Sequence, residues 1–287
     1  MKQLLILSGK GGTGKTTIAG AFIRLARAKA FADCDVDAPN LHLVMHQASA
    51  PQKIDYYGMD KVMIHRDKCK SCGACRIHCR FDAVYQGKDG YEVDPYACEG
   101  CGLCEVVCPA GAISLEPYIA GELKLYSKDT VFSTAQLKMG SGTSGKLVTE
   151  VKKQLQQEAK KADLAIIDGS PGIGCPVIAS LSGVDMVLVV AEPSLSGISD
   201  MERIISTAEK FQTKTAVCVN KYDTSKENTI KIEVFCWERN IPYAGRIPFD
   251  AEAVKAVNQG KSVVDMDCAA GKAIKEVFDN TLCILKQ

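Results

Sequence analysis

The sequence has no long hydrophobic run, no excess of either charge and no segment typical of an export signal. None of its 287 residues lies in an apolar stretch near the roughly 18 residues that a membrane-spanning helix needs, so we expect no membrane insertion. The 35 basic and 34 acidic residues leave a net charge of +1. Without a basic excess we expect no nucleic-acid partner. The apolar run after Lys2 is too short for a signal peptide and ends in glycines, which favours a cytoplasmic protein.

Cysteine, by contrast, is abundant. Eight of the 14 cysteines lie between Cys69 and Cys108. Because the chain shows no export signal, this clustering indicates metal binding in a reducing cytoplasm rather than a set of disulfides.

The N-terminal segment has the order strand, glycine-rich loop, helix and strand. Residues 3–7 are apolar, glycines follow, and residues 15–27 have one apolar helical face. Residues 28–32 form a second apolar run that leads into an acidic turn. Later apolar runs without alternation predict buried parallel strands; they are residues 164–167, 186–191 and 215–219. The pattern predicts an α/β fold with a mostly parallel, doubly wound sheet covered on both faces.

Residues 64–116 differ in composition from the rest of the chain. They are dense in Cys and Gly and contain only short apolar runs. We therefore expect a discontinuous main domain of residues 1–63 and 117–287, with a small domain of residues 64–116 inserted into it.

The first loop matches a phosphate-binding motif. Residues 9–16 read Gly-Lys-Gly-Gly-Thr-Gly-Lys-Thr, which fits G-x-x-x-x-G-K-[ST] between a strand and a helix. The glycines let backbone N–H groups surround phosphates, and the helix places its positive end there. Lys15 would neutralise the β- and γ-phosphate oxygens, and the Thr16 hydroxyl would bind Mg²⁺. The nucleotide-binding residues expected here are Gly9, Lys10, Gly11, Gly12, Thr13, Gly14, Lys15, Thr16 and Thr17.

Two polar residues follow apolar strands at the edge where α/β sheets bind ligands. Asp168 ends the run 164–167 and stands where a Walker B aspartate holds Mg²⁺, directly or through water. Asn220 follows the run 215–219 and can read a purine edge. Residues 220–223 read Asn-Lys-Tyr-Asp, which also fits the guanine-reading N-K-x-D pattern of GTPases, so this motif alone leaves the base open.

The loop GKGGTGKTT resembles the deviant Walker A motif of the MinD, ParA, Mrp and nitrogenase-iron-protein superfamily of P-loop ATPases. The resemblance extends over nearly the whole chain, through residues 35–40, 168–172 and 192–194. It implies a Mg²⁺-dependent ATPase that acts as a homodimer. In such a dimer Lys10 would reach the phosphates of the partner subunit and Asp35 would position or activate the attacking water. The resemblance also favours ATP, with Asn220 as the adenine contact. Lys10, Lys15, Asp35 and Asp168 are thus the expected catalytic residues.

The inserted segment repeats one cysteine spacing. Both halves have the form C-x2-C-x2-C-x3-C, which is the bacterial two-cluster ferredoxin pattern. In such ferredoxins the fourth cysteine of each motif binds the other cluster, which predicts two [4Fe–4S] clusters in a small α+β ferredoxin-like domain. The first would be held by Cys69, Cys72, Cys75 and Cys108, and the second by Cys98, Cys101, Cys104 and Cys79. Zinc is the competing interpretation, because paired C-x2-C units also suit tetrahedral zinc.

The other six cysteines form no C-x2-C pair, although Mrp-type scaffold proteins hold an interface cluster with such a pair. For Cys175 the favoured interpretation is a small buried residue. The alternative is that it approaches its dimer mate, in loose analogy to the nitrogenase iron protein.

The combination resembles MinD-superfamily ATPases with an inserted ferredoxin domain. The leading hypothesis is an ATPase that couples nucleotide binding and hydrolysis in a homodimer to electron transfer or to the docking of a redox partner. An accessory factor that delivers iron–sulfur clusters or other metallocofactors is the alternative, and its partner would be a metallocofactor-assembly protein. A positioning protein of the MinD or ParA type is the third possibility, and the near-neutral charge argues against it.

Overall fold

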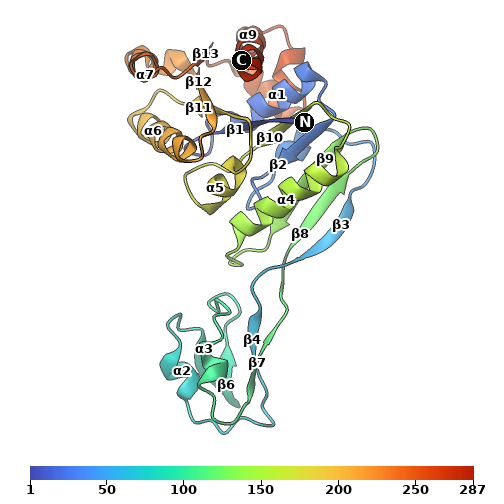
Figure 1. Cartoon of the computed structure of the whole chain (residues 1–287), viewed down its shortest axis with the longest axis vertical. Helices are drawn as coiled ribbons and strands as arrows, with labels where there is room; N and C mark the ends of the chain where they lie inside the picture. The colour runs from blue at the N-terminus through green and yellow to red at the C-terminus, as the bar shows by residue number, and fades with distance from the viewer. The chain divides into compact units, whose positions relative to one another are not determined.

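The computed structural model describes residues 1–287, which divide into two compact units. The first unit contains Met1–Lys53, Lys124–Ala135 and Gly145–Gln287, and the second contains Ile54–Leu123 and Gln136–Ser144 (Figure 1). The second unit includes all of residues 64–116 and extends beyond them on both sides. No helix in the chain has both the length and the apolar character needed to cross a membrane.

A nine-stranded sheet has the order β13-β12-β11-β1-β10-β2-β9-β8-β3. All pairings from β13 to β9 are parallel, which confirms the predicted α/β fold with a mostly parallel sheet. The strands along the chain are β1 (Lys2–Leu7), β2 (Ala30–Asp33), β3 (Gln52–Tyr57), β8 (Ile119–Tyr126), β9 (Val131–Leu137), β10 (Leu164–Asp168), β11 (Met186–Ala191), β12 (Lys214–Asn220) and β13 (Tyr243–Ile247). Their continuous apolar sequences follow from burial on both faces of the sheet.

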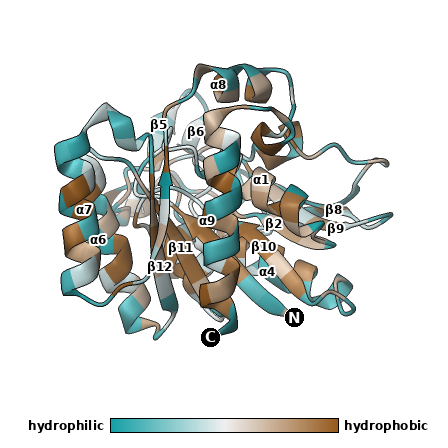
Figure 2. Ribbon diagram, turned by 90° about the horizontal axis from the view of Figure 1, so that it is seen from above, coloured by the Kyte–Doolittle hydropathy of each residue, from teal (hydrophilic) through white to brown (hydrophobic).

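Helices cover both faces of this sheet in the first unit. Alternate strand residues such as Leu4, Ile6 and Ile166 form one apolar core with α1 (Lys15–Ala26) and α9 (Ala269–Lys286). The intervening strand residues face the opposite layer. Its helices are α4 (Ser144–Glu158), α5 (Cys175–Leu181) and α6 (Leu195–Lys210). The remaining helices are α7 (Lys226–Glu238), α8 (Ala251–Asn258), η1 (Leu41–Leu43), η2 (Tyr222–Thr224) and η3 (Val263–Asp265). Figure 2 shows the hydrophobic strands between these helices.

The join between the first helix and the second strand differs from the sequence prediction. Helix α1 ends at Ala26, because Arg27 takes a left-handed conformation with φ of 47° and closes the helix with its N–H. Strand β2 therefore begins at Ala30 rather than residue 28, and its last residue is Asp33. Asp35 lies two residues beyond the end of the strand.

The second unit contains two short antiparallel pairs and two short helices. Strand β4 (Lys61–Ile64) pairs with β7 (Ile113–Glu116), and β5 (Val84–Gly87) pairs with β6 (Gly90–Val93). The helices α2 (Ala74–His78) and α3 (Leu103–Val106) each begin just before the third cysteine of one motif. A small buried cluster of Cys75, Val84, Cys104 and Ile113 forms the centre of the unit.

Candidate functional site

The glycine-rich loop joins β1 to the N-terminus of α1. Gly12 and Gly14 have φ of 79° and 90°, conformations that residues with a side chain rarely adopt. A Cβ atom at Gly14 would also collide with the side chain of Asn220. The backbone can therefore follow this course only with glycine, which leaves the N–H groups at the start of α1 available to an anion.

Lys15, Thr16 and Asp168 meet at the end of this loop. The Lys15 ammonium lies 2.5 Å from Asp168 Oδ1, and the Thr16 hydroxyl donates to Asp168 Oδ2 at 2.6 Å. The side chains of Lys15 and Asp168 are 6% and 0% exposed, so this is a buried ion pair. In this state the Lys15 ammonium neutralises the Asp168 carboxylate. The Thr16 hydroxyl, which the sequence predicts to bind Mg²⁺, lies beside that carboxylate.

Asp33 is a buried carboxylate that the sequence analysis did not assign to the site. It lies beside Asp168 in the register of β2 and β10 and is 0% exposed. Its carboxylate accepts hydrogen bonds from the backbone N–H groups of Asp35 at 3.0 Å, Asn40 at 2.9 Å and Leu41 at 2.9 Å. Burial, followed by the charge of Asp168, raises the pKa of Asp33 to about 7. Asp33 thus holds the loop that carries Asp35. The sequence feature that could have identified Asp33 was its place at the end of a fully buried strand.

A side-chain hydrogen bond joins the loop that carries Asp35 to the loop that follows Asp168. Ser170 Oγ donates to the carbonyl oxygen of Cys34 at 2.7 Å, and both residues are buried. Asp35 itself is partly buried, and burial raises its pKa, with the charge of Lys15 opposing that rise. A movement of one loop therefore either moves the other loop with it or breaks this hydrogen bond.

Lys10 makes its contacts within its own chain. Its ammonium lies 2.9 Å from Glu192 Oε2 and donates to Ser194 Oγ at 3.2 Å. Burial raises the pKa of Glu192, but the hydrogen bond from Lys10 and the charge of Lys221 outweigh it and hold the pKa below its ordinary value. In this single chain Lys10 is an intramolecular ion-pair partner, and the predicted contact with a second subunit requires that pair to open.

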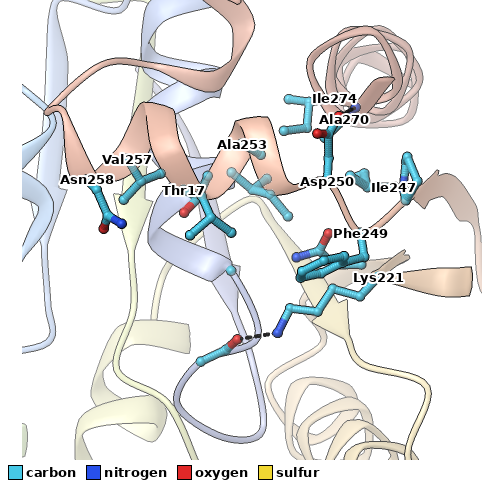
Figure 3. Close-up of a pocket in the computed structure, with 16 residues that line it drawn as sticks. Thr17, Lys221, Ile247, Phe249, Asp250, Ala253, Val257, Asn258, Ala270 and Ile274 are labelled. Carbon is cyan, nitrogen blue, oxygen red and sulfur yellow. Dashed lines mark hydrogen bonds between the residues drawn. The ribbon is translucent and has the colours of Figure 1, made fainter. Parts of the chain in front are cut away.

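A cavity of 270 Å³ lies beside the phosphate loop (Figure 3). Its walls come from the loop, from Asn220 and Lys221, from α8 and from the segment that follows β13. Asn220 Nδ2 donates to the carbonyl of Thr13 at 2.7 Å, and Lys221 Nζ donates to the carbonyl of Gly12 at 2.8 Å. Asp223 Oδ1 accepts the backbone N–H of Phe249 at 2.8 Å, so this carboxylate is used to fix the cavity wall.

A family comparison accords with this geometry. The family described as "CobQ/CobB/MinD/ParA nucleotide binding domain" matches residues 4–263. The chain belongs to this family.

Membership confirms the predicted relation to the MinD superfamily of P-loop ATPases. An uncharacterized protein of Methanocaldococcus jannaschii is 32% identical over 283 residues, which cover 96% of this chain and 95% of the relative. An iron-sulfur cluster carrier protein of Pyrococcus horikoshii is 23% identical and covers 99% of this chain and 87% of its own length. The solved structure of the septum site-determining protein MinD with Mg-ADP, from Pyrococcus horikoshii, shares the fold with a TM-score of 0.59 and 18% identity. That comparison covers 98% of this chain and 95% of the MinD chain.

This member of the CobQ/CobB/MinD/ParA family also gathers cysteines in its second unit. One pocket is lined by Cys69, Cys72, Cys75 and Cys108, so residues from the two ends of the cysteine-rich segment meet there. The backbone N–H of Ala112 donates to Cys108 Sγ at 3.3 Å.

The cysteine arrangement can be tested against two kinds of metal group. No group of three or more His, Cys, Asp or Glu side chains is close enough to hold a single metal ion. A zinc ion would bring four sulfurs within about 4 Å of one another, given Zn–S bonds of about 2.3 Å. The four thiolates of a [4Fe–4S] cluster bind different iron atoms and so lie farther apart. Four cysteine thiolates are the donor set that a [4Fe–4S] cluster takes, so the residues that line this pocket fit that group.

The other four cysteines of the insert are Cys79, Cys98, Cys101 and Cys104. Burial, with smaller contributions from Cys98 and Cys101, raises the pKa of the Cys104 thiol to about 11, which reflects the proximity of these three residues. Cys79 packs against the same small apolar cluster that contains Cys104. Lys61 Nζ donates to the carbonyl of Cys98.

Cys175 lies at the first position of α5 and is exposed. The interpretation of Cys175 as a small buried residue was wrong. The residue directly follows the glycine-rich turn after Asp168, and that turn leaves its side chain at the surface.

Proposed function

We propose that the chain is a Mg²⁺-dependent ATPase that acts as a homodimer and couples ATP binding and hydrolysis to electron transfer through two [4Fe–4S] clusters, or to the docking of a redox partner. The observation that carries this proposal is the pocket lined by Cys69, Cys72, Cys75 and Cys108. It occurs in the same chain as a phosphate loop with a buried Lys15–Asp168 pair. A nucleotide-driven conformational change and an electron carrier in one polypeptide are the two requirements of such coupling.

The nucleotide roles follow from the contacts at the loop. Lys15 would leave Asp168 for the β- and γ-phosphates, and Asp168 with Thr16 would then be free to hold Mg²⁺, directly or through water. Asp35 would orient the attacking water, because Asp33 fixes its loop beside Asp168. Lys10 would leave Glu192 to reach the phosphates of the partner subunit.

The cavity favours adenine over guanine. Guanine recognition by an N-K-x-D sequence depends on the Asp carboxylate, and here the N–H of Phe249 engages Oδ1 of Asp223, one of its two oxygens. Asn220 lies at the cavity and at Gly14, where it would meet the base. The nucleotide proposed is therefore ATP.

The second unit would be the ferredoxin-like domain, with residues 64–116 as its cluster-binding part. Cys69, Cys72, Cys75 and Cys108 would hold one cluster, and the remaining set of Cys98, Cys101, Cys104 and Cys79 would hold the other. A [4Fe–4S] cluster supplies a one-electron carrier. The chain would hold each cluster by residues from both motifs, which fixes the two halves of the segment together.

Cluster content and hydrolysis test this proposal. Protein purified without oxygen is expected to contain about eight iron and eight acid-labile sulfide per chain, given two four-iron clusters. It should hydrolyse ATP in the presence of Mg²⁺, and Lys15→Ala should lose that activity while keeping its iron. Cys108→Ala should lose about half of the iron and still hydrolyse ATP above the Lys15→Ala rate. Stoichiometric zinc, or no hydrolysis above the Lys15→Ala rate, would contradict the proposal.

A second candidate is supported by the name of one relative. The Pyrococcus horikoshii relative is named an iron-sulfur cluster carrier protein, which favours delivery of a cluster to a metallocofactor-assembly or target protein. In that case the cysteine sites would release their clusters to an apo-protein when ATP is added. A transfer assay with an apo-ferredoxin, scored by the loss of iron from the chain, separates delivery from electron transfer.

A further inference from the structure

The cysteine-rich segment is electrically polarised along its sequence. Residues 61–88 contain seven Lys or Arg and two Asp, whereas residues 89–116 contain six Asp or Glu and no Lys or Arg. The first motif therefore lies in a basic half and the second in an acidic half, inside a chain whose net charge is only +1.

Part of this charge is neutralised within the unit. Arg66 pairs with Glu92 at 3.1 Å and with Asp89 at 3.5 Å, and Lys61 bonds to the carbonyl of Cys98. The Lys and Arg side chains within the first motif or directly beside it are exposed and form no ion pair. They are Lys68, Lys70, Arg76 and Arg80, and we call them the basic face. Lys70 also lines the pocket of Cys69, Cys72, Cys75 and Cys108.

An exposed apolar side chain lies among these charges. Ile77 is 80% exposed on α2 and follows Arg76 directly. Val106 on α3 occupies the equivalent place in the second motif and is 82% exposed, but it follows Glu105. The two motifs thus offer similar apolar contacts and opposite charge.

We propose that the basic face, together with the exposed Ile77, docks an acidic electron-transfer protein at the site of Cys69, Cys72, Cys75 and Cys108. The inference rests on the proposed redox function, because it assigns that site an electron partner. Charge complementarity selects a partner with an acidic surface. Ile77 offers that partner an exposed apolar contact directly after Arg76, and Cys72 at the surface brings the site within reach of the partner.

Electron exchange with a small acidic ferredoxin is the probe. The reduced holoprotein is mixed with the oxidised ferredoxin, so that the protein loses one electron and the ferredoxin gains it, and the rate is followed by stopped flow. Electrostatic steering raises association rates by about 10 to 1,000-fold and weakens steeply with ionic strength. We expect the wild-type rate to fall at least about tenfold between roughly 0.05 M and 0.5 M salt.

Charge reversal within the basic face locates the effect. Lys68→Glu with Arg76→Glu should slow the exchange at low salt by about tenfold or more and flatten its salt dependence. Lys160→Glu with Lys161→Glu changes the net charge equally at exposed positions of the first unit and should keep the wild-type rate. Equal slowing by both variants, or an unchanged rate and salt slope in the first, would overturn the proposal.

Separate measurements keep this proposal distinct from the proposed function. Iron content, cluster EPR and ATP hydrolysis of the Lys68→Glu and Arg76→Glu variant should match the wild type. If the wild type contains clusters and exchanges electrons quickly, but without dependence on salt or on the basic face, the redox function stands and this docking site fails. If a single-stranded DNA oligonucleotide binds the basic face and ferredoxin does not, the assigned partner is wrong.

Discussion

Replacing Lys15 by Met should destabilise the nucleotide-free first unit as well as abolish ATP hydrolysis. The Lys15 ammonium and the Asp168 carboxylate are 2.5 Å apart and almost fully buried. At that distance an effective dielectric constant of about 20 gives an attraction of roughly 7 kcal/mol. The free-energy cost of removing both charges from water offsets much of this attraction. Loss of one partner, however, leaves the other charge buried and unpaired. Such a loss costs about 3–5 kcal/mol of unfolding free energy.

The effect of Lys15→Met should grow with pH. Asp33 and Asp35 lie near the same ammonium, whose charge lowers the pKa of both, against the larger effect of burial. Without Lys15 both carboxyl groups hold protons more firmly in the folded state than in the unfolded chain. The unfolding free energy then falls as pH rises, because deprotonation favours the unfolded chain. The deficit relative to wild type should be larger at pH 8 than at pH 5.5.

Native-state hydrogen exchange of peptides from β1 and β10 measures this stability in the first unit alone. The double variant Lys15→Met with Asp168→Asn removes both charges and should recover at least half of the loss, which gives a coupling energy of several kcal/mol. A loss below about 1 kcal/mol in the single variant, or a double variant that is less stable than the single one, would refute this reasoning.

Three further predictions concern other buried or paired charges. Lys152 donates to the carbonyls of Ala179, Ser180 and Ser182 at the end of α5, so Lys152→Met should lower the unfolding free energy by about 2–4 kcal/mol in denaturant titrations, and no change would contradict this. Because burial and then Asp168 raise the pKa of Asp33 from 3.8 to about 7, the stability of the nucleotide-free protein should fall as pH rises from about 4 to 7. That slope should be smaller in Asp33→Asn, and an equal slope would exclude Asp33 as its source. Glu192→Gln releases Lys10 from a partly exposed pair worth about 0.2–1 kcal/mol, so the Mg-ATP dimer should tighten up to about fivefold by ultracentrifugation; weaker dimerisation would contradict a restraining role.

The sheet and the phosphate loop were predictable from local sequence. Runs such as residues 186–191 are apolar without alternation because both faces of a parallel strand are buried, and β11 has those bounds. The loop was predictable because its glycines are required by backbone conformation, as at Gly14. In both cases the physical requirement falls on consecutive residues and is therefore visible in the sequence.

The contacts that organise the nucleotide site were not predictable in this way. The role of Asp33 depends on the return of the chain to it at Asn40 and Leu41. The partner of Lys10 lies 182 positions away at Glu192. Lys152 is one of five charged residues in the 15-residue helix α4, yet it is buried because the carbonyl groups at the end of α5 accept hydrogen bonds from it. These features arise from packing between distant segments.

The cysteine sites fall between these cases. The spacing of each motif predicts a pair of metal sites but does not by itself establish which group is bound. The structure brings Cys108 to the pocket of Cys69, Cys72 and Cys75, as an exchange of the fourth cysteine between motifs requires. The identity of the group and the homodimer stay predictions that the experiments above address.

The measurement that tests the central claim most directly is ATP hydrolysis by protein purified without oxygen, first with its clusters fully reduced and then with them oxidised, with Lys15→Ala as the blank. The account predicts a rate that changes severalfold between the two states, because the nucleotide site and the clusters would be coupled. Equal rates in both states would contradict that coupling in the isolated protein and would favour delivery of clusters to another protein.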